Sequence, residues 1–73
     1  MTDYRLLVAQ GKQVVFSDER EFGKIWKSIL EQDVVEFDAE LIDGDDRYVG
    51  HIAMQRQHII GLFLELDRKR SGR

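Results

Sequence analysis

The chain has 73 residues, a length that allows one hydrophobic core and excludes a second domain or a catalytic cleft between domains. It has no cysteine, which excludes disulfides and thiolate zinc sites, and no run approaches the roughly 18 apolar residues of a membrane span, so we expect a soluble, cytoplasmic protein. Fourteen acidic and eleven basic side chains give a formal net charge of -3. Proteins that bind nucleic acid usually have a surplus of basic residues instead.

Two short apolar segments at the start of the chain predict a β-hairpin. They span residues 4–10 and 13–17, and Gly11 and Lys12 separate them. A two-residue loop with glycine first is typical of a type II′ turn. The charged first residues, with no long apolar segment after them, do not predict a signal peptide.

A helix is predicted next, because apolar residues recur at i, i+3, i+4, i+7 and i+8, the one-face pattern of a helix packed on a core. These residues are Phe22, Ile25, Trp26, Ile29 and Leu30. Ser17 or Asp18 can cap this helix, and Asp18 with Glu21 has the spacing of a capping box. Gly23 costs a helix about 1 kcal/mol relative to alanine, and we expect it where the helix backbone approaches the sheet closely.

From Val34 onward the period changes to two, which predicts a strand with one apolar and one acidic face. Residues 43–46 have turn chemistry, and a four-residue loop there places Ile42 opposite Arg47. On the apolar face, this register pairs Leu41 with Tyr48, Ala39 with Gly50, Phe37 with Ile52 and Val35 with Met54. On the acidic face it leaves Asp38 opposite His51.

The last apolar run, residues 59–66, allows two phases. A three-residue turn at 55–57, which we prefer, sends Ile60, Leu62, Leu64 and Leu66 to the core and pairs Arg47 with Glu65. A two-residue turn at 56–57 reverses that phase. Either phase leaves apolar side chains on the outer face, from Ile59 and Phe63 with Val49 or from the leucine row, and such a surplus marks contact with another chain, including a homodimer.

The sequence therefore predicts an α+β domain over residues 1–67, with one helix packed on an antiparallel sheet in the order ββαβββ. Residues 68–73 form a basic tail that we expect to be disordered.

Carboxylates dominate the middle of the chain, where residues 33–46 contain seven acidic and no basic side chains. Three of them lie on one sheet face, and a flat solvated face provides no pocket to separate their pKa values for acid/base catalysis. Docking on a basic partner surface is the alternative to a merely solvated face. The candidate contacts are Glu36, Asp38, Glu40, Asp43, Asp45 and Asp46.

No pattern in the chain indicates a cofactor, a metal or an enzyme. The loop at residues 43–46 lacks the spacing and terminal glutamate of an EF-hand, and His51 and His58 are too few and too far apart for zinc. No nucleophile elbow, P-loop or dinucleotide fingerprint is present. Trp26 lies on the apolar helix stripe, which favours core filling over base stacking.

The basic tail is the basis of the alternative function, nucleic-acid binding. Its cationic residues can contact phosphate, and in that case binding falls steeply with salt. They are Arg68, Lys69, Arg70 and Arg73. No interleaving of aromatic and basic residues accompanies them, so we rank nucleic-acid binding below protein binding and an enzyme below both.

In its small size, dense charge, lack of cysteine and lack of a catalytic set, the chain resembles the small proteins that bacteriophages make to bind and redirect host machinery, inhibitors of bacterial RNA polymerase above all. The resemblance covers the whole chain in character and includes no motif, so it assigns no role to any residue. It implies a protein that docks on the polymerase and keeps a subunit or factor from its working position. Because polymerase surfaces that face DNA are basic, we expect the six carboxylates to make the contacts.

Overall fold

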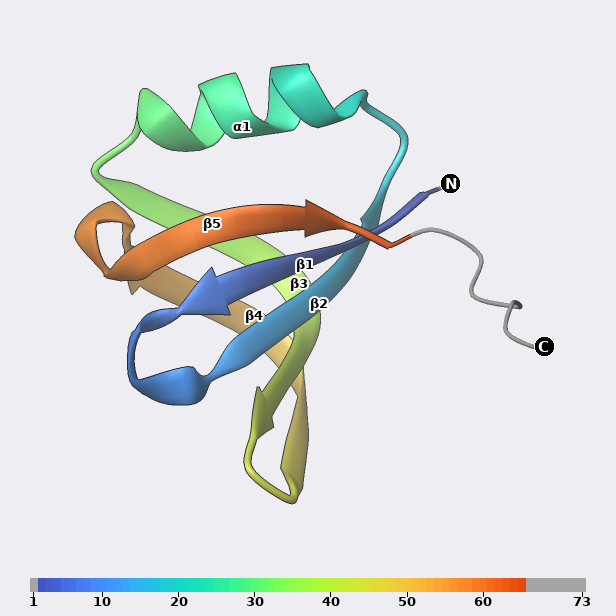
Figure 1. The fold of residues 1–73 in the computed structure, drawn as a ribbon, viewed down its shortest axis with the longest axis vertical. Coiled ribbons are helices and arrows are strands. Elements are labelled where there is room, and N and C mark those ends of the chain that lie inside the picture. Colours follow the sequence, from blue (N-terminus) through green and yellow to red (C-terminus); the bar gives the residue numbers. More distant parts are fainter. Residues whose placement is uncertain (1, 66–73) are drawn as a thin grey trace, which may run out of the picture.

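The structure is a computed structural model that describes residues 2–65. Its elements follow in the order β1 (Thr2–Val8), η1 (Ala9–Gly11), β2 (Gln13–Asp18), α1 (Phe22–Leu30), β3 (Val34–Asp43), β4 (Asp46–Gln55), η2 (Arg56–His58) and β5 (Ile59–Leu64). This order confirms the predicted ββαβββ arrangement, with one helix packed against a five-stranded antiparallel sheet (Figure 1).

The sheet curls strongly around its core. Its strand order is β4-β3-β2-β1-β5, so β4 and β5 are the edge strands, yet the three-residue η2 connects them. Val8 of β1 and Met54 of β4 line the same surface depression although β2 and β3 lie between their strands in the sheet. The pairing of the last strand beside β4 was wrongly predicted, because β5 crosses to the opposite edge and pairs with β1.

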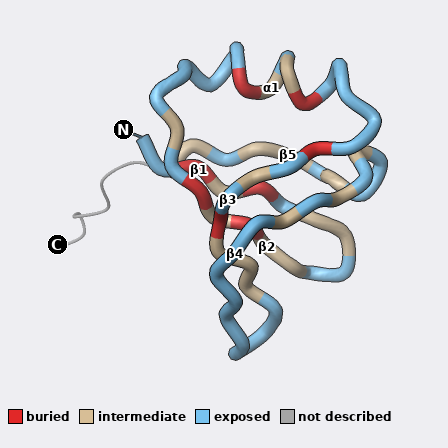
Figure 2. The backbone as a smooth tube through the Cα atoms, turned by 180° about the vertical axis from the view of Figure 1, so that it is seen from behind, coloured by how far each residue is buried: buried red, intermediate tan, exposed pale blue. Residues whose placement is uncertain are grey.

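The core lies between the concave face of the sheet and α1, which crosses the open side of the curl (Figure 2). Apolar side chains from β1, β2, α1 and β3 meet there and exclude water. The buried residues are Tyr4, Leu6, Val14, Phe16, Ile25, Ile29, Val35 and Ala39. Each large aliphatic side chain buried in this way contributes about 1.5–3 kcal/mol of transfer free energy, so this small cluster dominates the stability of the domain.

The helix uses part of the predicted apolar stripe. Ile25 and Ile29 are buried and Trp26 packs against the core at its border, whereas Phe22 and Leu30 are 39% and 50% exposed. Gly23 is also exposed and nothing lies within 4 Å of where its Cβ would be, so the expected close approach to the sheet is wrong. Within the described residues, no helix is long and apolar enough to cross a membrane.

The predicted capping box does not form. Glu21 is the N-cap residue and no side chain caps the helix. Asp18 instead accepts a hydrogen bond from the main-chain N–H of Arg20 at 2.8 Å, and the Ser17 hydroxyl donates to Asp3 at 2.6 Å. Both side chains therefore stabilise the end of β2 and the turn after it.

The β1–β2 hairpin was predicted correctly, but its turn is longer than the expected two residues. The chain passes through η1, and the main-chain N–H of Val8 donates to the carbonyl of Lys12 at 3.0 Å. Gln10 and Gly11 both have positive φ, 68° and 76°. The turn thus contains two successive residues in the left-handed conformation, whereas a type II′ turn at Gly11-Lys12 would need only one, Gly11.

The predicted register of β3 with β4 is confirmed along its whole length, including Ile42 opposite Arg47 and Asp38 opposite His51. Asp43 pairs with Asp46 as well, so the turn itself contains only Gly44 and Asp45 and is tighter than predicted. The strict alternation of apolar and acidic residues in β3 determines this register, because a slip by one residue would bury its carboxylates.

The preferred phase of β5 is confirmed in part. Leu62 and Leu64 pack against the core, but a register shift against β1 leaves Ile60 69% exposed and turns Ile59 inward. The expected Arg47–Glu65 pair is wrong, because Glu65 follows a strand that lies next to β1. Leu66 lies outside the described residues.

Candidate functional site: the acidic β3–β4 hairpin

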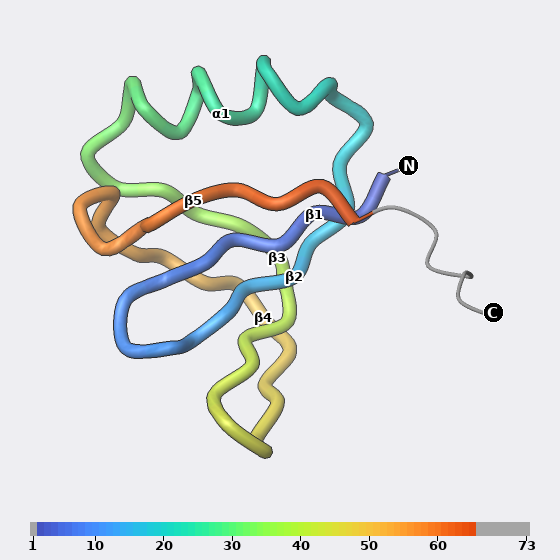
Figure 3. The backbone as a smooth tube through the Cα atoms, in the orientation of Figure 1, coloured from blue at the N-terminus to red at the C-terminus, as the bar shows by residue number. Residues whose placement is uncertain are grey.

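The β3–β4 hairpin, called the acidic hairpin below, is the longest element of the fold. Its strands pair over ten positions, whereas β2 pairs with β3 at only three, from Gln13 to Val15. The end of the hairpin therefore projects from the rest of the sheet (Figure 3). All residues of β4 from Asp46 to His51 are exposed.

Three predicted site residues, Glu36, Asp38 and Glu40, lie together on the outer face of the acidic hairpin. They alternate with Val35 and Ala39, which are buried in the core. Successive carboxylates of one strand face are about 6.8 Å apart along the strand. The row is therefore an evenly spaced set of carboxylates on one face of β3.

His51 of β4 lies between two of these carboxylates. Its Nδ1 is 2.8 Å from an oxygen of Asp38, its direct partner across the strands, and its Nε2 is 2.8 Å from an oxygen of Glu36. A neutral imidazole has one N–H and the imidazolium has two, so the charged form satisfies both contacts. Hydrogen bonds that the ring donates to Glu36, and then to Asp38, raise the pKa of His51.

The remaining carboxylates of the acidic hairpin lie closer to its end. Glu40 forms an ion pair with Arg47 at 3.3 Å, and Asp43 lies 4.0 Å from Lys12 on the neighbouring β1–β2 turn. Asp45 and Asp46 are exposed at the turn. The structure thus divides the six predicted contacts into a row on the sheet face and a cluster at the tip.

Two partners of this site were not predicted. Glu36 reaches His51 diagonally across the strands, and Arg47 binds Glu40 instead of Glu65. In the predicted register both carboxylates are diagonal neighbours of these basic residues, and a search extended to diagonal pairs would have found them.

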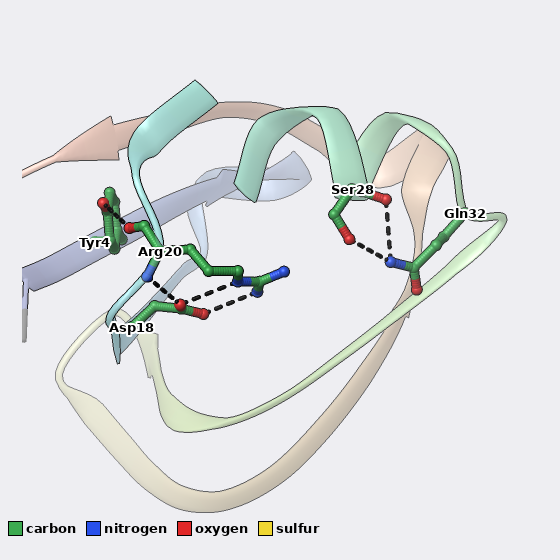
Figure 4. Close-up of polar contacts among 5 residues, drawn as sticks. All are labelled: Tyr4, Asp18, Arg20, Ser28 and Gln32. Carbon is green, nitrogen blue, oxygen red and sulfur yellow. Dashed lines mark hydrogen bonds and ion pairs between the residues drawn. The ribbon is translucent and has the colours of Figure 1, made fainter. Parts of the chain in front are cut away.

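A second polar cluster stabilises the entry into the helix and lies away from the acidic hairpin (Figure 4). The guanidinium of Arg20 donates to both carboxylate oxygens of Asp18, at 3.0 and 2.8 Å, and this contact lowers the pKa of Asp18. Gln32 similarly closes the other end of α1 by donating to the carbonyl and the hydroxyl of Ser28. These contacts join residues close in sequence and stabilise the two ends of α1, so they do not indicate a binding site.

Two of the depressions that residues 2–65 form on the surface have volumes of about 260 and 280 Å³. The first is lined by Asp33, Val34, Gln55, Arg56 and Gln57, and the second by Val8, Ala9, Gln10, Lys12, Met54, Gln55 and His58. Across residues 2–65, no group of three or more His, Cys, Asp or Glu side chains is arranged to hold a metal ion.

The other predicted surfaces have different outcomes. Arg68, Lys69, Arg70 and Arg73 lie outside the described residues. The outer sheet face does expose apolar side chains, from Leu7, Val49 and Phe63, whereas Ile59 packs inward and does not contribute. Comparisons with protein-family models, with curated proteins and with solved structures found no match to this chain.

Proposed function

We propose that this chain is a non-enzymatic protein-binding module whose acidic hairpin docks on a basic surface of a larger assembly. The observation that supports it is the segregation of charge. Residues 34–55 carry six carboxylates and one arginine, whereas the rest of the chain carries eight acidic and ten basic side chains. One projecting element thus concentrates the negative charge of a molecule that is slightly basic elsewhere.

The placement of these charges favours recognition over chemistry. The side chain of Asp38 is 91% exposed and that of Glu36 is 57% exposed, so neither lies in a water-excluding pocket. Complementary charge on a rigid surface steers association and rejects partners of the wrong sign. The apolar side chains exposed nearby, Tyr48 and Val49, add the contact area that charge alone does not provide.

The resemblance to small phage proteins suggests a specific target, the bacterial RNA polymerase. The mechanism would be occupancy. The acidic hairpin covers a basic polymerase surface and prevents a subunit, a factor or the DNA from taking its working position, which inhibits or redirects transcription.

The test compares two charge-reversed variants. In Asp45→Arg/Asp46→Arg the tip of the acidic hairpin is reversed, and in the matched control Glu19→Arg/Glu31→Arg two exposed carboxylates elsewhere are reversed. Both variants gain the same charge. Each tagged protein and the wild type are used to capture partners from nuclease-treated bacterial lysate, and each is titrated against purified bacterial RNA polymerase.

The proposal requires one stoichiometric partner that the wild type and the control retain and the hairpin variant loses. Equal capture by all three proteins would overturn it. Failure to bind purified polymerase, with another assembly captured, would exclude the specific target alone. Loss of binding only on deleting residues 68–73, with steep salt dependence, would move the function to the basic tail.

A further inference from the structure

His51 lies at the centre of the acidic row. It is the one side chain there that can gain or lose a positive charge near neutral pH. The groups around it are few. On β3 it faces Glu36 and Asp38, with Glu40 next along the row, and on its own strand the nearest charge is Arg47, which binds Glu40. Since β4 is an edge strand of the described sheet, no further strand faces His51 from the other side.

We infer that His51 regulates the docking face: in its protonated form it screens Glu36 and Asp38, and when it loses its proton it releases them to a basic partner. This inference rests on the proposed function. It follows from the number of donors on the ring, because the two 2.8 Å contacts need two N–H groups. A neutral ring keeps one N–H, so it can donate to only one of the two carboxylates.

Loss of the proton also changes the charge of the row. Glu36, Asp38 and the imidazolium together carry one negative charge, and the same three groups with a neutral ring carry two. The protonated and the neutral forms of His51 therefore differ by one unit of charge at the centre of the acidic row. The side chain of His51 is 59% exposed, so the ring exchanges protons freely with solvent.

The direction of the effect follows from the sign of the partner. Affinity for a cationic surface should rise as the pH rises and His51 loses its charge. One additional unit charge at contact distance in water corresponds to a gain of about fivefold in affinity. Salt should reduce this gain, because exposed charges are screened.

The experiment uses the whole chain and an octalysine peptide as the cationic probe. Affinity is measured at about pH 6 and about pH 8.5, on either side of the range in which histidine titrates, for the wild type, for His51→Gln and for the matched control His58→Gln. Separately, the titration of the His51 ring is followed by NMR in the wild type and in Glu36→Gln/Asp38→Asn.

The inference predicts that the His51 ring titrates at a higher pH in the wild type than in Glu36→Gln/Asp38→Asn. It also predicts that affinity for octalysine rises about fivefold between the two pH values in the wild type and in His58→Gln, and stays constant in His51→Gln.

Two results would overturn the inference in different ways. If the ring titrates at the same pH in both proteins, or if His51→Gln keeps the pH dependence, His51 is no regulator and the proposed docking function still stands. If the ring titrates as expected but Glu36→Gln/Asp38→Asn binds octalysine at about pH 8.5 as tightly as the wild type, the acidic row is not the docking face and both proposals fail.

Discussion

The hydroxyl of Tyr4 in β1 donates a hydrogen bond to the main-chain oxygen of Arg20 at 2.8 Å, and this contact ties the first strand to the turn that leads into the helix (Figure 4). The ring of the same residue is buried and stacks on Phe16 with a centroid distance of 5.6 Å. Tyr4 therefore has two separable roles, one apolar and one polar.

Replacing Tyr4 with phenylalanine should destabilise the domain by about 1–2 kcal/mol, because the ring stays in place while the carbonyl of Arg20 loses its partner. The free energy of unfolding in urea measures this cost. Tyr48→Phe is the matched control, since Tyr48 is 56% exposed and should change stability little. Equal stability of Tyr4→Phe and the wild type would mean that water replaces the hydroxyl.

Truncating Ile29 to alanine should cost about 2–5 kcal/mol, because the side chain is 2% exposed and its removal leaves a cavity between the helix and the sheet. Thermal unfolding followed by circular dichroism gives the comparison. Leu30→Ala is the control on the same helix turn, and a small effect is expected from a residue that is 50% exposed. If Ile29→Ala does not fold, Ile29→Val should still unfold cooperatively, with a loss of about 0.5–1.5 kcal/mol.

Gly44→Ala should destabilise the acidic hairpin by about 1–2 kcal/mol, because Gly44 has a φ of 63° and a left-handed backbone is costly for residues with a Cβ. Nothing lies within 4 Å of the added Cβ, so the cost is conformational alone. Gly61→Ala is the control, with equally open space and no positive φ. Chemical denaturation of both variants checks the prediction, which equal losses would contradict.

Asp18→Asn should remove a pH-dependent part of the stability. Hydrogen bonds from Arg20 lower the pKa of Asp18 below its ordinary value of 3.8. A lowered pKa in the folded state stabilises the fold at pH values above the ordinary pKa of the carboxyl group. This contribution disappears as the pH falls through the pKa of the folded state. The wild type should therefore exceed the variant in stability at neutral pH, and the difference should shrink once the pH falls below 3.8.

Unfolding in urea at neutral and at acidic pH tests this sign. The side chain of Asp18 is 19% exposed, and the charge-assisted contact with Arg20 is worth about 1 kcal/mol at such a site. Asp45→Asn, at the exposed turn, serves as the control. A difference that grows toward acidic pH would contradict the assignment.

The parts of the fold that local pattern determines could be predicted from the sequence. The register of β3 with β4 is an example, because the two strands are neighbours in sequence and the alternation of Val35, Glu36, Phe37 and Asp38 allows one arrangement. The helix face is another, since Ile25 and Ile29 recur at helical spacing. The acidic row of the candidate site follows from the same alternation.

Long-range pairing could not be predicted in this way. Residues 59–64 are apolar on both faces, so their pattern contains no information about which strand lies beside them. The shift that exposes Ile60 depends on the register with β1, more than fifty residues earlier in the chain. Asp18 has the sequence spacing of a helix cap, but its carboxylate instead accepts a hydrogen bond from a closer donor, the main-chain N–H of Arg20.

The pairing of β1 with β5 affects how the domain folds. Arg5 and Glu65, sixty residues apart in the chain, form an ion pair at 3.0 Å, and the N–H of Glu65 donates to the carbonyl of Asp3 at the same distance. Contacts of such long sequence separation slow folding, because the entropy of closing the loop is lost before they form. The pairing of β1 with β5 therefore depends on a long-range closure, whereas the β1–β2 hairpin and the acidic hairpin can form from local contacts.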